Sequence, residues 1–138
     1  MSRLIFAVAG ALAVQALSSG PAAATAGMGC AALDDSGAAV EMNLPRAAGT
    51  QPNWVRVHAG GELFSSLSID DDATPIHTRQ SFDAGDTFDI DLTGEGHDEA
   101  TIRIRLLRAE EGDEAPVYIG YLHVVGEGIH PITCTEDE

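Results

Sequence analysis

The stretch TFDIDLTGEGHDEATIRIRLLR, residues 87–108, decides the fold of this chain because apolar and polar side chains alternate at both of its ends. Alternation with a period of two is typical of a β-strand that buries one face. Between the two alternating segments lies a short polar segment with Gly94 and Gly96, and glycine favours tight turns. The sequence therefore predicts a β-hairpin here.

The spacing of the apolar residues predicts the register of this hairpin. If Leu92 pairs with Ala100, the apolar side chains of both strands share one buried face, and residues 93–99 form the tip. The same register places Asp89 opposite Arg103 on the solvent face, where a cross-strand ion pair accounts for this carboxylate. The other expected pairs are Ile90 with Ile102, Phe88 with Ile104 and Thr87 with Arg105.

The rest of the chain repeats this pattern, and no window shows a helical period. Short strands separated by glycine and aspartate turns indicate an all-β fold, a small antiparallel β-sandwich or barrel of about eight strands. Within residues 62–69 the expected inward side chains are Leu63, Leu67 and Ile69. The candidate strands span residues 30–33, 38–44, 54–58, 62–69, 76–82, 87–92, 101–108, 116–125 and 129–134.

Two cysteines, Cys30 and Cys134, lie near the ends of the predicted domain, and a disulfide between them is the simplest expectation for an exported chain. This bond also tests the strand count. If successive strands alternate in direction, the start of the first and the end of the ninth lie at opposite ends of the sheet. A disulfide allows less than about 7 Å between the two Cα atoms. Either the count is even, most simply eight, or one connection crosses the domain.

The segment 76–82, which follows Pro75, is one of the least regular candidate strands. Whether this segment is a strand or a loop determines how two acidic stretches, residues 70–72 and the tip of the hairpin, lie relative to each other. If 76–82 is a strand, residues 70–72 lie at the same end of the domain as the tip of the hairpin. If it is a loop, the two stretches lie at opposite ends.

Residues 1–26 have the features of a secretory signal peptide. Arg3 supplies the positive charge, residues 4–17 form an apolar run too short to span a bilayer, and residues 24–26 form an A-x-A cleavage site. The expected mature chain, residues 27–138, is a single domain. We therefore expect a periplasmic or secreted protein with no membrane insertion after cleavage.

Carboxylates dominate the charge of the chain. There are 22 acidic residues, seven arginines and no lysine, which gives a formal net charge of −15, or −16 once Arg3 is removed. This charge argues against nucleic acid and anionic membranes as partners. It is compatible with a basic protein partner, with divalent cations, and with simple solubility of an exported protein.

Oxygen-bearing side chains recur at positions 1, 3, 5 and 9 of the segment 91–99, with glycine at positions 4 and 6. Calcium takes six to eight oxygen ligands, and glycines permit the curvature of a tight ligand loop. This segment resembles the short Asp-rich calcium loop of integrin-type FG-GAP repeats and, more loosely, the DLDGDG-type hairpin of some small periplasmic lysozyme inhibitors. The resemblance implies these calcium ligands: the side chains of Asp91, Thr93, Glu95 and Glu99 and the carbonyl of His97. The alternative is a solvated acidic turn in which Gly94 or Gly96 has a positive φ.

The segment 116–122 is the most apolar of the predicted domain, and it places Tyr118 and Tyr121 on opposite faces of a strand. Tyrosine and tryptophan suit protein interfaces because they combine an apolar body with a polar atom. Tyr118, Tyr121 and Trp54 are therefore candidate interface residues. The alternative is that one tyrosine and Trp54 pack in the core.

No motif for catalysis stands out. The five histidines lie outside any zinc spacing, and Ser65 and Ser66 lack the Gly-x-Ser-x-Gly context of a nucleophile elbow. We therefore predict no catalytic residues and expect an exported acidic binding or interaction domain, stabilised by calcium if the tip binds it. The alternatives are a protein inhibitor of a basic secreted hydrolase such as lysozyme, and a small periplasmic hydrolase.

Overall fold

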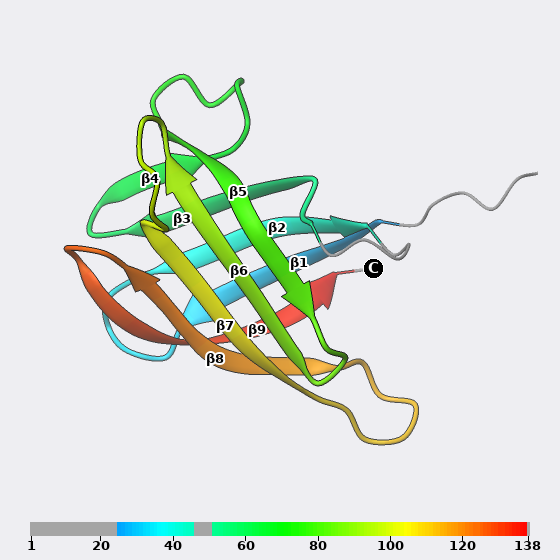
Figure 1. Cartoon of the computed structure of the whole chain (residues 1–138). Coiled ribbons are helices and arrows are strands. Elements are labelled where there is room, and N and C mark those ends of the chain that lie inside the picture. The colour runs from blue at the N-terminus through cyan, green and yellow to red at the C-terminus, as the bar shows by residue number, and fades with distance from the viewer. Residues whose placement is uncertain (1–24, 46–50, 138) are drawn as a thin grey trace, which may run out of the picture.

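The computed structural model describes residues 25–45 and 51–137. These residues form nine β-strands that close into one barrel (Figure 1). The predicted all-β class is confirmed, with a barrel of nine strands where about eight were expected. The strands are β1 (Thr25–Ala32), β2 (Ala39–Pro45), β3 (Trp54–Ala59), β4 (Glu62–Ser65), β5 (Thr74–Asp83), β6 (Thr87–Gly94), β7 (Ile102–Ala109), β8 (Val117–Val124) and β9 (Gly128–Asp137).

Most of the predicted signal peptide, residues 1–24, lies outside the described residues. The predicted cleavage point after Ala26 falls within β1, whose pairing with β2 starts at Thr25 and whose pairing with β9 starts at Gly27. A chain that begins at Gly27 therefore keeps every pair of the β1–β9 ladder. In the described ranges, no helix is long and apolar enough to cross a membrane.

One parallel pair reconciles nine strands with the disulfide. The strands follow one another around the barrel in chain order, and all neighbours are antiparallel except β4 and β5. Because β4 and β5 run in the same direction, β9 runs antiparallel to β1 and places Cys134 directly opposite Cys30. The odd number of strands is therefore compatible with the disulfide, because the β4–β5 connection breaks the alternation of strand directions.

The predicted disulfide between Cys30 and Cys134 is present, and both residues are buried. Their Cα atoms are 4.0 Å apart, and 104 positions separate them in the sequence. The bond therefore joins the first and the last strand at the seam where the barrel closes.

β4 is shorter than predicted, and residues 66–73 leave the wall of the barrel after Ser65. The expectation that Leu63 and Ile69 point inward is wrong, because Phe64 packs against the core opposite Val57 and Ile69 is 76% exposed. The connection is held outside by Asp70, whose carboxylate accepts two hydrogen bonds from Arg56, at 2.8 Å each, and one from Ser65. A local ion pair thus fastens the β4–β5 connection to β3.

The predicted strand 76–82 is real and lies within β5. Its residue Ile76 pairs with Gly94 at the end of β6. The acidic residues 70–72 come directly before β5, so they lie toward the same end of the barrel as the tip of the β6–β7 hairpin, as predicted for this case.

Apolar side chains from all the strands fill the barrel. The period-two pattern holds in most of them, since alternate residues of β2, β3, β6 and β7 are almost fully buried. The largest fully buried side chains are Met28, Met42, Ile90, Leu92, Ile102, Ile104, Leu106, Leu122, Ile132, Val40, Val55 and Val57.

The register of the β6–β7 hairpin differs from the prediction by two residues. Leu92 pairs with Ile102, where pairing with Ala100 was expected. The shift keeps the same side chains inside, because two residues are one full period of a strand. It lengthens the tip, in which the Thr93 hydroxyl lies within hydrogen-bond distance of the His97 carbonyl, at 3.0 Å, and of the Glu99 carbonyl, at 2.8 Å. On the outer face, the expected partner of Asp89 changes from Arg103 to Arg105.

Candidate functional site

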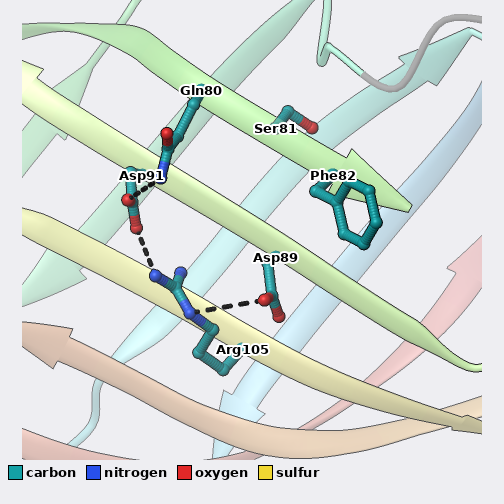
Figure 2. Close-up of a pocket in the computed structure, with 6 residues that line it drawn as sticks. All are labelled: Gln80, Ser81, Phe82, Asp89, Asp91 and Arg105. Carbon is teal, nitrogen blue, oxygen red and sulfur yellow. Dashed lines mark hydrogen bonds and ion pairs between the residues drawn. The ribbon is translucent and has the colours of Figure 1, made fainter. Parts of the chain in front are cut away.

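A pocket of about 370 Å³ lies on the outer wall of the barrel, across β5, β6 and β7 (Figure 2). It combines two carboxylates, one guanidinium, one amide and one aromatic ring. Pockets of 300–1,000 Å³ with a few convergent polar groups are typical of small-ligand sites. The lining residues are Gln80, Ser81, Phe82, Asp89, Asp91 and Arg105.

A bulge in β5 creates this arrangement. The pairing of β5 with β6 shifts between Thr78 and Gln80, so that Gln80 pairs with Asp91 and Phe82 pairs with Asp89. β-Bulges commonly re-aim side chains in this way beside binding sites. As a result, the amide and the ring both stand on the outer face beside a carboxylate.

Asp91 is the fixed centre of the pocket. It stands on the outer face of the sheet but is only 6% exposed. One carboxylate oxygen accepts a 2.6 Å hydrogen bond from Arg105 Nη2, and the other accepts a 2.5 Å bond from Gln80 Nε2. Arg105 Nη1 also donates to the carbonyls of Ile90 and Ile104, at 3.0 and 2.9 Å. Asp91 and Arg105 therefore neutralise and orient each other.

Asp89 is held more loosely. Its Oδ2 lies 3.7 Å from Arg105 Nε, and its side chain is 43% exposed. Figure 2 shows Asp89 between Arg105 and the ring of Phe82, which is itself 62% exposed. Two carboxylates and one guanidinium line the pocket, so acidic groups outnumber basic ones in its lining. It can offer a carboxylate and an aromatic surface to a cation.

A strip of exposed apolar side chains adjoins the pocket. Val117, Ile119 and Tyr121 alternate along the outer face of β8, and Leu107 of β7 pairs with Ile119. We call these four residues the β8 strip. Tyr121 pairs with Arg105, so the strip and the pocket share one continuous face of the barrel.

The three predicted interface residues occupy different environments. Tyr121 is exposed on the β8 strip, whereas Tyr118 points inward, as predicted for opposite faces. The Tyr118 hydroxyl donates a 2.5 Å hydrogen bond to Glu136. Burial, as the larger cause, and this hydrogen bond, as the second, raise the pKa of the hydroxyl above its usual range. Trp54 is half-buried, with the guanidinium of Arg56 5.5 Å from its ring. Only Tyr121 of the three lies near the pocket.

The structure brings two of the predicted calcium ligands together, the Thr93 hydroxyl and the His97 carbonyl, which lie 3.0 Å apart. Asp91 is bound to Arg105 and Gln80 on the barrel wall, and the Thr93 hydroxyl contacts the carbonyls of His97 and Glu99. The predicted positive φ is found at Gly96, at 75°. Glu95, His97 and Glu99 are exposed in the tip. Within residues 25–45 and 51–137, no three His, Cys, Asp or Glu side chains lie close enough together to hold a metal ion. Calcium binding by this loop stays a prediction.

A second polar cluster lies on the outer face of β3. Arg56 and Ser65 both donate hydrogen bonds to Asp70. These hydrogen bonds lower the pKa of the Asp70 carboxyl to about 2, and the bond from Arg56 has the larger effect. The Ser65 hydroxyl is thus a hydrogen-bond partner of Asp70. This cluster attaches the β4–β5 connection to the barrel.

The sequence offered little signal for the pocket. Gln80, Phe82 and Arg105 become neighbours of Asp89 and Asp91 only through the two-residue register shift and the β5 bulge. The sequence signals are the carboxylates of residues 89 and 91 and the alternation in residues 101–108, which places Arg105 outside.

Neither a family model nor a curated protein nor a solved structure matches this chain.

Proposed function

We propose that the chain is an exported, non-catalytic binding domain that docks a basic protein through the β8 strip. The observation that carries this proposal is the strip itself: Leu107, Val117, Ile119 and Tyr121 are exposed side by side on a chain with a net charge of −15. Contiguous exposed apolar residues with a polar surround are characteristic of interaction sites.

Charge supports a basic partner over a second copy of the chain. The β7–β8 connection, residues 110–114, brings four exposed carboxylates to one end of the strip. The β5–β6 turn lies beside it, since Arg108 N donates to Asp86 O at 2.8 Å, and adds Asp83 and Asp86. Two copies would bring like charges together, whereas a basic protein would be attracted and steered to this face.

The test is a binding measurement with two basic proteins of unrelated fold, a basic lysozyme and cytochrome c, at about 0.05 and 0.15 M salt. We expect saturable binding to at least one of them at the higher salt. Replacing the apolar centre of the strip, Ile119→Ser, should weaken this binding by about tenfold, as for a core interface residue.

The matched control is Ile69→Ser, the same substitution at an exposed residue of the β4–β5 connection. It should leave the affinity unchanged. Equal losses in both variants, or the disappearance of all binding at 0.15 M salt, would overturn the proposal, because only unspecific charge attraction would then remain.

The second candidate is an inhibitor of a basic secreted hydrolase. The disulfide at the barrel seam supports it, because a rigid binding face loses little conformational entropy on association. The same lysozyme titration decides between the two candidates if cell-wall hydrolysis is followed in parallel. If lysozyme loses its activity as binding saturates, the chain is an inhibitor. If the bound lysozyme keeps full activity, the chain is a binding domain that does not inhibit.

A further inference from the structure

We propose that the side of the pocket formed by Asp89 and Phe82 receives an arginine side chain of the basic partner. This inference rests on the proposed function and specifies its anchoring contact. It starts from the imbalance of charge among the six described residues that line the pocket, which include the two carboxylates of Asp89 and Asp91 and one cation, Arg105.

The bonding of Arg105 decides which carboxylate is available. Nη1 and Nη2 of its guanidinium are directed to Asp91 and to the backbone carbonyls of Ile90 and Ile104. Only Nε faces Asp89, at 3.7 Å, which is longer than a hydrogen bond. Asp91 thus neutralises Arg105, and the carboxylate of Asp89 keeps its negative charge and its capacity to accept hydrogen bonds.

Phe82 supplies the second half of the site. Its ring flanks Asp89 on the side away from Arg105 (Figure 2) and is 62% exposed. An exposed aromatic face beside a carboxylate suits a planar cation, which can stack on the ring while it hydrogen-bonds to the oxygens. A guanidinium fits this geometry better than an ammonium, because it presents a flat face and a fork of N–H donors.

The position of the site relative to the β8 strip links it to a protein ligand. Phe82, Asp89, Arg105 and Tyr121 are successive neighbours across β5, β6, β7 and β8. A partner whose apolar residues cover the strip therefore carries its adjacent side chains over the pocket. An arginine at the rim of that partner's apolar patch would reach Asp89.

The site is tested in the full chain by two-dimensional amide NMR, with N-acetylarginine methylamide and N-acetyllysine methylamide as probes. We expect saturable shifts of the amides of Phe82, Asp89 and Arg105, with the arginine probe binding at least about threefold more tightly than the lysine probe. Asp89→Asn should reduce the affinity for the arginine probe by about tenfold, and Phe82→Leu by about threefold.

Asp35→Asn is the matched control, since it removes the same charge from an exposed residue of the β1–β2 loop. Circular dichroism checks that each variant is folded. If Asp89→Asn does not fold, the Phe82→Leu variant still tests the site. Shifts that are unchanged in both pocket variants, an equal response to the two probes, or equal losses in Asp89→Asn and Asp35→Asn would overturn the proposal.

The two proposals fail separately. If the arginine probe binds at Asp89 but neither basic protein binds, the arginine site is supported and the proposed docking function is refuted. If a basic protein binds through Ile119 and its affinity is the same for Asp89→Asn and Asp35→Asn, the docking function stands and the arginine site does not.

Discussion

Breaking the bond between Cys30 and Cys134 should remove a large share of the stability of the barrel. The two cysteines are direct partners on β1 and β9, so the native pairing does not depend on the covalent bond. Reduction therefore leaves the folded barrel in place and acts mainly on the unfolded chain, which gains the freedom to separate its ends.

The size of the effect follows from the loop length. For residues 104 positions apart, the chain-entropy treatment gives a loss of about 16 cal/mol/K in the unfolded state, or about 4.7 kcal/mol at 25 °C. Measured effects of disulfides usually fall at about 2 to 4 kcal/mol. A domain of this size has a total stability of about 5 to 15 kcal/mol, so the reduced protein should unfold at clearly lower urea concentration.

The assay is urea unfolding of the oxidised chain and of the same chain kept reduced. This comparison is preferable to substitution because both cysteines are buried, and replacing them would also alter packing. We expect the free energy of unfolding to fall by about 2 to 5 kcal/mol on reduction and the m-value to rise, because an unlinked unfolded chain exposes more surface. A fall of less than about 1 kcal/mol with an unchanged m-value would refute the reasoning.

Four further predictions follow from individual contacts. A Cβ at position 120 would lie 1.8 Å from the Arg105 carbonyl oxygen, so Gly120→Ala should force β7 and β8 apart. The free energy of unfolding in urea should fall by about 3 kcal/mol or more. In the control Gly27→Ala, whose added Cβ has its nearest contact at 3.6 Å, it should fall by less than about 1 kcal/mol. Equal effects at the two glycines would contradict this. Asp91→Ala removes one member of a largely buried ion pair and should cost about 2 to 3 kcal/mol, against less than about 1 kcal/mol for Asp89→Ala, whose side chain is half exposed. Similar losses from the two substitutions would show that Asp91 is no more engaged than Asp89. Because Arg56 and Ser65 lower the pKa of Asp70 from 3.8 to about 2, its contribution to stability is fully present above about pH 4 and is lost as the pH falls toward 2. Asp70→Asn should flatten the melting-temperature profile between pH 4 and pH 2 relative to Asp72→Asn, and parallel profiles would rule out this role. Finally, a calcium site in the hairpin tip predicts a rise in melting temperature at about 10 mM calcium, given the roughly 0.1 to 1 mM affinity expected of extracellular sites, and loss of that rise in Glu99→Ala. No rise in the unaltered chain would dismiss the site.

The sequence by itself determined the strands and the buried faces of most of them. Each of the nine predicted segments contains or overlaps an observed strand, and Val40, Val55, Ile90 and Ile104 lie inside the barrel as their alternation indicated. The reason is that the two faces of a strand are set by a local period of two, which any few consecutive residues reveal. The cysteine pair was likewise predictable, since only one pairing exists within the chain.

Tertiary structure alone decided the register, the closure and the pocket. A shift of two residues in the β6–β7 hairpin keeps every apolar side chain inside, so hydrophobic pattern could not separate pairing of Leu92 with Ala100 from pairing with Ile102. The bulge before Gln80 and the parallel pairing of β4 with β5 leave no periodic pattern in the sequence from which they could be predicted. These long-range choices placed Asp91, a predicted calcium ligand, against Arg105 and Gln80, because a side chain's neighbours across a sheet depend on pairing, and pairing is not encoded in any single strand.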